Sequence, residues 1–290
     1  ADRCSGFLVA QHAMDTAMEL ADEYGIGVVV VDNAFHYLWG AGWVMRASRK
    51  GYIAFTTCTG ALPEVAPHGG SKPTLGTNPW TWALPTADVL GFDFVMDWAT
   101  SVVSNGTVKA LARDGKPCPA GAIVDAAGQP TLDPSRFHAH ACFGGYKGYG
   151  LCVLTELLAA FGGGSLPTLR CSGKPPPGEK ATPYFYFQVM RPDAIAGASF
   201  GAGRSQMENV RAVAADILNG NSGARLPGVG KHQAAALSER EGGILLSTAE
   251  VATLKNYAVK HGVDFPTFFP VEGSAPAKMR EEDRKPDRDN

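Results

Sequence analysis

The segment 63–85 places five prolines and three glycines among 23 residues, too many for any regular helix or strand. Glycine and proline are also frequent elsewhere, with 35 and 20 residues in a chain of 290. So many turns argue against a helical bundle, and the lack of a repeat of about 20 to 50 residues excludes solenoids and propellers. We therefore expect a loop-rich fold that contains a sheet, with 63–85 as a structured loop.

The spacing of apolar residues, together with turn signals, predicts the regular elements. Helices are predicted at 8–24, 43–49, 151–161, 205–218 and 247–261. In the last of these, Ser247 and Glu250 form a capping-box pattern. Strands are predicted at 27–31, 52–57, 92–96, 108–113 and 184–190. The first strand, GVVVV, has the continuous β-branched pattern that is typical of burial on both faces.

Composition divides the chain into four predicted parts. Residues 1–50 form a helix-strand part that packs with the terminal helical domain, 51–203 form a sheet domain, and 204–271 form a C-terminal helical part. Within the sheet domain, residues 162–180 are rich in glycine and proline, which predicts a linker or flap. Residues 272–290 are rich in proline and charged residues, which predicts a disordered tail.

Charge and hydropathy exclude two classes of partner. Lys and Arg number 26 against 28 Asp and Glu, and this net charge of −2 gives no bulk attraction to nucleic acid or to an anionic membrane. No apolar stretch approaches the about 18 to 20 residues of a membrane span, and no signal-peptide pattern is present. The six cysteines form no CxxC pair, which indicates free thiols. We expect a soluble protein of the cytoplasm or an organelle matrix, and, since it starts at Ala1 without Met, a processed or truncated product.

The segment GGYKGYG at 144–150 is the most suggestive local feature. Its glycines allow the backbone to approach a ligand, and Lys147 stands just before a predicted helix whose free N–H groups carry partial positive charge. This arrangement suits an anionic group such as a phosphate. The alternative is a glycine-rich start of a helix with a solvated lysine, since the spacing matches neither the Walker loop nor GxGxxG.

Further positions carry side chains suited to binding or proton transfer. His36 can protonate or polarise a carbonyl near neutral pH, although its aromatic neighbours suit a packed core histidine equally well. Asp97 follows a predicted apolar strand, where a carboxylate either points into a cleft or caps a turn. Thr77 and Asn78 in GTNP can offer a hydroxyl and an amide to a substrate carboxylate, or form an Asx-type turn before a proline.

Three residues at alternate positions resemble a metal site only superficially: His138, His140 and Cys142. They would share one face of a strand, but their spacing matches no standard zinc pattern and no fourth ligand is evident. We expect ordinary strand or surface residues here and no bound metal.

Seven segments occur in the same order as in a known enzyme family. They are VVVVDNAFHYLWGAG with the helix before it, VAPHGG, LGTNP, VMDWATS, KPCPAGAIVDAAGQPTLDP, GGYKGYGL and RLPG. Together they resemble the malate/L-lactate dehydrogenase family that lacks a Rossmann fold, which also includes ureidoglycolate dehydrogenase, sulfolactate dehydrogenase, diketogulonate reductase and piperideine-2-carboxylate reductase. The resemblance covers residues from about 10 to about 262.

The resemblance implies an α/β (α+β) fold, with a mostly antiparallel central sheet, flanking helices and a non-Rossmann NAD(P)-binding domain at 51–203. It implies NAD or NADP as cofactor, a small 2-oxo or 2-hydroxy acid as substrate, and a homodimer. His36 is the implied acid/base group, and Thr77 is the implied substrate contact, beside Asn78, which we also assign to substrate binding. The implied cofactor contacts are His36, Tyr37, Leu38, Trp39, Gly40, Asp97, Trp98, Ala99, Lys147, Gly148, Pro227 and Gly228.

The sequence departs from the family pattern at several positions. No Ser-His pair precedes His36, Thr107 stands where the imine reductases have an aspartate, and Val229 replaces the acidic residue that usually follows the Pro-Gly pair. Thr107 argues against reduction of piperideine carboxylate, and Val229 indicates an altered substrate pocket. The departures together keep a second function open, a catalytically impaired family member that serves as a nucleotide-binding or structural assembly protein. The third possible function is that of a generic anion-binding domain outside the family.

Overall fold

The structure is a computed structural model that describes residues 3–164, 182–196 and 203–266. Its residue contacts group into two compact units, Ala1–Val229 and Gly230–Asn290. The four-part division expected from the sequence stays a prediction. The predicted tail and nearly all of the predicted linker at 162–180 lie outside the described residues.

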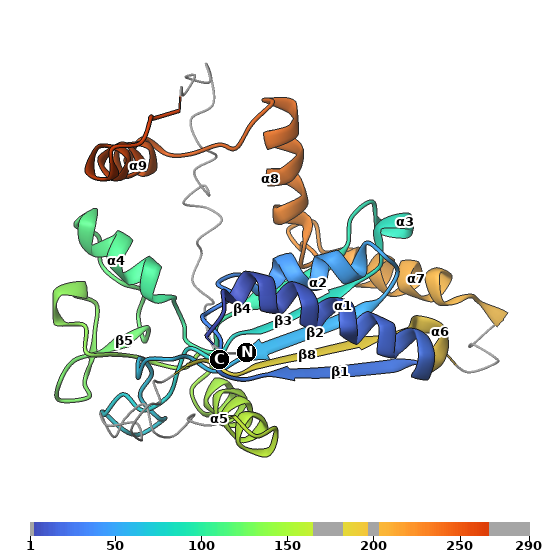
Figure 1. Cartoon of the computed structure of the whole chain (residues 1–290), viewed down its shortest axis with the longest axis horizontal. Helices are drawn as coiled ribbons and strands as arrows, with labels where there is room; N and C mark the ends of the chain where they lie inside the picture. The colour runs from blue at the N-terminus through green and yellow to red at the C-terminus, as the bar shows by residue number, and fades with distance from the viewer. Residues whose placement is uncertain (1–2, 165–181, 197–202, 267–290) are drawn as a thin grey trace. The chain divides into compact units, whose positions relative to one another are not determined.

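Five strands form the central sheet of the first unit (Figure 1). Their order is β1 (Ile26–Val31), β8 (Phe185–Met190), β2 (Ile53–Cys58), β3 (Trp80–Leu84) and β4 (Phe94–Trp98). A second sheet has the order β6 (Pro130–Thr131), β5 (Ile123–Val124) and β7 (Ala139–His140). All of these strand pairs are antiparallel, which confirms the predicted antiparallel sheet.

Helices cover both faces of the five-stranded sheet (Figure 1). α1 (Gly6–Tyr24) and α2 (Gly40–Ser48) lie on one face, and α5 (Tyr146–Phe161) lies on the other. Gly25 ends α1 in a left-handed conformation (φ 84°), which glycine adopts without strain. Further helices among the described residues of this unit are α3 (Ala87–Leu90), α4 (Asn105–Arg113), the 3₁₀ helix η1 (Pro134–Arg136), α6 (Pro192–Ile195) and α7 (Gln206–Leu218).

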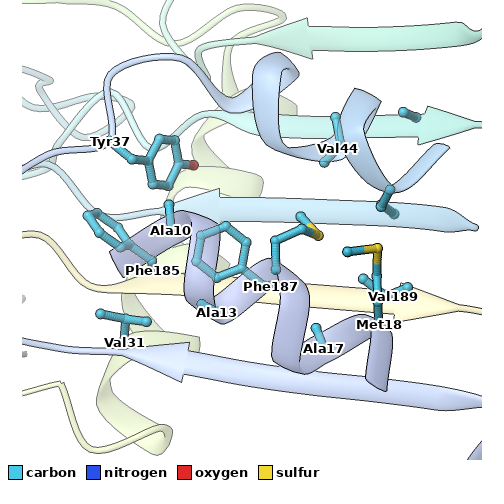
Figure 2. Packing of buried hydrophobic residues seen from close by; sticks show 14 of the residues in the cluster. Ala10, Ala13, Ala17, Met18, Val31, Tyr37, Val44, Phe185, Phe187 and Val189 are labelled. Atoms are coloured by element: carbon cyan, nitrogen blue, oxygen red, sulfur yellow. The ribbon is translucent and has the colours of Figure 1, made fainter. Parts of the chain in front are cut away.

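The main core lies between the sheet and the two helices α1 and α2. The aromatic rings of Phe185 and Phe187 on β8 pack against Tyr37, with ring centroids 4.6 Å and 5.9 Å from it (Figure 2). α1 contributes small residues that let the helix lie close to these rings: Ala10, Ala13 and Ala17. The loop that carries Tyr37 is thereby tied to the centre of the sheet.

β1 is exposed on one face, so the prediction that GVVVV is buried on both faces is wrong. Gly27 and Val31 are buried, whereas Val28 and Val30 are 44% and 43% exposed. β1 is the edge strand of the sheet order, and α1 covers one of its faces. A β-branched run indicates a strand, but it does not say how many faces the fold will cover.

Two other predictions of secondary structure are wrong. The segment 63–85 is not without regular elements, because its last residues form β3 and pair with both β2 and β4. Residues 108–113 belong to α4 and not to a strand, because Ser104 caps this helix by accepting a hydrogen bond from the Thr107 N–H (3.1 Å). A short apolar run fits both the helical and the strand period, so the serine cap decides between a helix and a strand.

The C-terminal part contains α8 (Val229–Arg240), which was not predicted, and α9 (Thr248–His261). α9 begins with the predicted capping box: Ser247 Oγ accepts from the Glu250 N–H (3.3 Å), and Glu250 Oε2 accepts from the Ser247 N–H (2.7 Å). Among the helices of the described residues, none has the length and apolar character that crossing a membrane requires.

Candidate functional site

The loop from His36 to Gly40 joins β1 to α2 and is anchored at two places. Tyr37 is fully buried, with its hydroxyl oxygen 3.4 Å from Thr56 Oγ1 on β2. Gly40 lies so close to β3 that a Cβ atom there would be 2.4 Å from Thr81 Oγ1. The side chains between these anchors are exposed: Leu38 and Trp39.

Both ring nitrogens of His36 face groups of the protein. Nδ1 accepts a hydrogen bond from the Leu38 N–H (2.7 Å), and Nε2 lies 3.8 Å from Cys58 Sγ. Because Nδ1 is an acceptor, the neutral ring carries its proton on Nε2. Burial lowers the pKa of His36, which favours the neutral ring further. At neutral pH, His36 is therefore a hydrogen-bond donor through Nε2.

Asp97, near the end of β4, is joined to this loop through Thr81. Thr81 Oγ1 donates a hydrogen bond to Asp97 Oδ1 (2.8 Å). Burial raises the pKa of Tyr37, and it raises the pKa of Cys58 to about 12; in both cases the nearby Asp97 carboxylate adds to the increase. The structure thus brings the predicted carboxylate next to the predicted histidine loop.

The residues after Asp97 connect β4 to the glycine-rich turn before α5. The Trp98 and Phe143 ring centroids are 6.0 Å apart, and the Phe143 N–H donates to the Thr100 carbonyl (3.0 Å). The Phe143 carbonyl accepts from the Gly148 N–H (3.1 Å), and a Cβ atom at Gly148 would be 2.3 Å from that oxygen, so only glycine fits. Of the predicted cofactor contacts here, Trp98 is 39% exposed and Ala99 is half-buried.

Lys147 lies in the first turn of α5 and is exposed. The helix starts after Gly145 without a side-chain cap. Two of its first N–H groups donate to backbone carbonyls instead, Lys147 to Gly144 (3.2 Å) and Gly148 to Phe143 (3.1 Å). Within the described residues the Lys147 ammonium forms no ion pair. A cation and an uncapped helix N-terminus at one place both favour an anion.

A cavity of about 740 Å³ opens beside this end of α5. Glycine, alanine and backbone atoms make up much of its wall, which comes from residues 66–71, part of 120–130, Val102, Ala141, Cys142, Gly144 and Gly145. His68 lies at the helix start, since a Cβ atom at Gly145 would be 3.3 Å from its Cε1. No role was predicted for His68, Gly69 or Gly70. The sequence signal at this place is the glycine pair, which lets the backbone approach a ligand.

Thr77 and Asn78 lie on the loop before β3. The Thr77 carbonyl accepts hydrogen bonds from both the N–H and the Oγ1 of Thr100 (2.9 Å each). The buried Asn78 amide accepts from the Gly60 N–H (3.1 Å) and donates to the Glu156 carboxylate (2.8 Å) and to the carbonyl and Sγ of Cys152 (3.0 and 3.3 Å). Both ends of the Asn78 amide are thus engaged within the protein, and its role in substrate binding stays a prediction.

Pro227 and Gly228 lie against β4. The Pro227 carbonyl accepts a hydrogen bond from the Val95 N–H (3.3 Å). A Cβ atom at Gly228 (φ 107°) would be 2.5 Å from the Asp93 carbonyl oxygen. These two predicted cofactor contacts therefore reach the strand that carries Asp97.

The three residues that superficially resemble a metal site do not gather in one. Among the described residues, no three His, Cys, Asp or Glu side chains are placed to hold a metal ion. His140 is fully buried with its ring 4.7 Å from that of Phe137, and neither ring nitrogen has a hydrogen-bond partner in the described part of the chain. Burial lowers the pKa of His140 to about 4, which makes it an uncharged core residue at neutral pH.

Acidification is expected to destabilise the protein through His140. The unfolded chain takes up this proton near the ordinary pKa of 6.5, whereas the folded protein resists protonation until about pH 4. The free energy of unfolding therefore falls as the pH decreases, by about 1–2 kcal/mol from pH 7 to pH 5. The variant His140→Phe lacks this contribution. Urea denaturation at both pH values measures it, and an equal loss in the wild type and the variant would contradict the prediction.

Comparison with known proteins gives relatives over most of the chain. The model of the malate/L-lactate dehydrogenase family matches residues 1–255. A Δ1-pyrroline-2-carboxylate/Δ1-piperideine-2-carboxylate reductase of Pseudomonas putida is 34% identical over 252 residues, which cover 83% of this chain and 72% of that protein. An L-sulfolactate dehydrogenase of Methanocaldococcus jannaschii is 33% identical over 195 residues, 66% of this chain and 55% of that protein.

Solved structures share the fold. The Δ1-piperideine-2-carboxylate reductase of Pseudomonas syringae has a TM-score of 0.70 at 28% identity, covering 84% of this chain and 72% of its own. The sulfolactate dehydrogenase of Methanocaldococcus jannaschii has a TM-score of 0.69 at 26% identity, and the match covers 91% of this chain and 78% of that structure. These proteins are dehydrogenases and reductases by name, which confirms the predicted oxidoreductase class. The chain belongs to the malate/L-lactate dehydrogenase family.

Proposed function

We propose that the chain is an NAD(P)-dependent oxidoreductase of a small 2-oxo or 2-hydroxy acid. The observation that carries the proposal is the set of contacts that links the His36 loop, through Thr81 and Asp97 and then Trp98 and Phe143, to Gly148 in the first turn of α5. A cavity of about 740 Å³, lined in part by Gly144 and Gly145, opens beside this turn. Bound NADH or NADPH would supply a hydride to the carbon next to the substrate carboxylate. The names of the relatives include sulfolactate and pyrroline-2-carboxylate, which are both small acids.

The residues at the start of α5 fit a dinucleotide. Gly144 and Gly145 adopt positive φ (56° and 59°), which leaves this wall without side chains where a pyrophosphate can approach. The Lys147 ammonium and the positive end of the α5 dipole offer positive charge to it. The cavity volume is also within the range of about 300–1,000 Å³ that is usual for small-molecule and cofactor sites.

His36 acts in this proposal through Nε2, the nitrogen that carries the proton in the neutral ring. Reduction of a 2-oxo acid produces an alkoxide, which must gain a proton. The Nε2–H of the neutral His36 ring donates a hydrogen bond to this oxygen. We assign the proton transfer to His36 in its imidazolium form, which returns to the neutral ring when the alkoxide takes the proton. Thr77 is the proposed substrate contact, and we assign Asn78 to positioning the Thr77 loop, because its amide already bonds with Gly60 and α5.

The second candidate function is a catalytically impaired family member that binds nucleotide or serves in an assembly. One observation favours it: Nδ1 of His36 is already bonded to the Leu38 N–H, and Nε2 faces the Cys58 thiol. A protein of this kind would bind NADH or NADPH without oxidising it in the presence of any small oxo or imino acid. An assay with pyruvate, oxaloacetate and cyclic imino acids separates the two functions.

Replacing Lys147 with alanine is expected to weaken cofactor binding about tenfold, because a charge-assisted hydrogen bond to phosphate or ribose is lost. Titration of NADH and NADPH, followed by nicotinamide fluorescence, measures the dissociation constant. Turnover at saturating cofactor should change less than affinity. The control is Lys109→Ala, which removes an exposed lysine of α4. An unchanged affinity in Lys147→Ala would remove this residue from the site.

The oligomeric state and location stay predictions. We propose a homodimer on the family resemblance alone, and sedimentation velocity of the full chain checks it. A cytoplasmic or organelle-matrix location is proposed from the sequence, and fractionation of cells checks it.

A further inference from the structure

Cys58, the last residue of β2, lies directly beside the imidazole of His36. Its Sγ is 3.8 Å from His36 Nε2, and its side chain is fully buried. The pairing of β2 with β8 places Cys58 opposite Phe185, and the side chains of such a pair lie on the same face of the sheet. The Phe185 ring also packs against His36, with ring centroids 6.3 Å apart. The imidazole therefore rests on one cross-strand pair of the central sheet.

The direction of the hydrogen bond between His36 and Cys58 follows from the neighbouring bond. His36 Nδ1 accepts from the Leu38 N–H (2.7 Å), so the neutral ring carries its proton on Nε2. Nε2 is then the donor, and the sulfur is the acceptor. Burial raises the pKa of Cys58 to about 12, and the carboxylates of Asp97 and Glu156 add to the increase. At neutral pH the acceptor is therefore an uncharged thiol.

A thiol is a weak hydrogen-bond acceptor, and this weakness suits a group that must release a proton. The bond to sulfur restrains the direction of the Nε2–H. The oxygen of a bound 2-oxo acid is a stronger acceptor, above all when it gains negative charge during reduction. The Nε2–H can therefore pass from the sulfur to the substrate oxygen, whereas an amide oxygen in place of the thiol would compete for it.

We propose that Cys58 is a positioning residue for His36: its sulfur orients the Nε2–H of the resting enzyme in a bond that the substrate oxygen then replaces. The inference rests on the proposed function, in which His36 supplies the proton to the substrate. It gives the contact between the thiol and the imidazole a role in turnover. The sulfur itself forms no covalent bond to substrate or cofactor.

The pKa of His36 in the free protein tests the contact without any turnover. Cys58→Ala removes the acceptor from the imidazolium and is expected to lower this pKa by about half a unit. Cys58→Asn supplies a stronger acceptor, the amide oxygen, and is expected to raise it by about the same amount. Serine is unsuitable, because its C–O bond is shorter than the C–S bond and its oxygen would lie farther from Nε2.

NMR titration of the full chain, followed at the imidazole Cε1–H, measures the pKa of His36 in the wild type and both variants. His36→Gln assigns the resonance. Both substitutions disturb the packing of the core, but only a hydrogen bond to Nε2 predicts shifts of opposite sign. An unchanged pKa, or a shift of the same sign in both variants, would overturn the proposal.

The pH dependence of kcat/KM for the oxo or imino acid tests the role in turnover. This profile reports the groups of the free enzyme, and reduction needs the imidazolium, so the rate falls as the pH rises through the pKa of His36. We expect this alkaline limb to move to lower pH in Cys58→Ala and to higher pH in Cys58→Asn. We also expect kcat to fall about tenfold in Cys58→Asn, because the amide competes with the substrate oxygen. Limbs that stay in place in both variants speak against the proposal.

Cys118→Ala is the matched control, because Cys118 is also buried but belongs to a different cluster, with Val108 and Ile123. It is expected to leave the pKa of His36 and the alkaline limb unchanged. Failure of the proposed function has a different signature. If no oxo or imino acid is turned over, that function fails and the role of Cys58 in turnover fails with it, whereas opposite shifts of the His36 pKa would still establish the contact.

Discussion

Replacing Asn78 with alanine is expected to lower the free energy of unfolding by about 3 kcal/mol. The side chain is fully buried, and its loss removes a hydrogen-bond partner from the Gly60 N–H, the Cys152 carbonyl and the Glu156 carboxylate. A buried polar group that loses its partner costs about 1–3 kcal/mol, and a charged one costs more. These bonds join the loop before β3 to α5, so the variant loosens the site as well as the fold. Urea denaturation followed by circular dichroism measures the loss.

The variant Asn78→Asp gives a sharper version of the same test. It keeps the shape of the side chain, but it replaces a nitrogen donor that lies 2.8 Å from Glu156 Oε1 with an oxygen. Two carboxylates at this separation resist ionising together, so we expect at least the same destabilisation at pH 7 and a partial recovery at lower pH, where one of them holds a proton. A loss below about 1 kcal/mol in both variants would contradict the role of these hydrogen bonds.

Replacing Phe185 with alanine is expected to cost about 3–5 kcal/mol, because it opens a cavity in the main core. The ring is fully buried beside Tyr37 (Figure 2). Its centroid lies 4.6 Å from that of Tyr37 and 6.3 Å from that of His36. The loop that carries both residues would lose its support on β8. We therefore expect weaker NADH or NADPH binding along with the lower stability. Urea denaturation and the fluorescence titration measure the two effects.

The matched control for Phe185→Ala is Val30→Ala on the neighbouring strand β1. Val30 is 43% exposed, so its truncation is expected to cost less than about 1 kcal/mol. Similar losses of the free energy of unfolding in Phe185→Ala and Val30→Ala would contradict the position of Phe185 in the main core.

Some elements could be predicted because several local signals agree. α7 and α9 each combine an apolar period with a serine cap and a glutamate three residues later, and both capping boxes form. β3 was missed because the prolines and glycines of 63–85 masked the alternating residues at its end. α4 was misassigned because the apolar residues in 108–113 fit a strand and a helix equally, and only the cap at Ser104 separates them.

The residues of the proposed site could be selected from the sequence one by one, but the contacts between the elements that carry them could not. Lys147 and Asp97 could be selected because a glycine-rich turn and the end of a strand mark them. The route between the histidine loop and Asp97 runs through Thr81, which lies in the segment assigned as a loop, and it depends on the register of β3 against β4. The state of His36 depends on Leu38, whose positive φ (65°) is uncommon outside glycine and has no sequence signal.

The strand order also has a consequence for how the chain is made. β8 lies between β1 and β2 in the sheet, although it is the last of the five strands along the chain. β1 therefore emerges from the ribosome long before its partner does, with a row of unpaired backbone groups and valines beside it. Pairing across so many residues slows folding and leaves strand edges open to other nascent chains. The centre of this sheet can form only after β8 has been synthesised. Until then, the unpaired edge of β1 needs shielding from other chains.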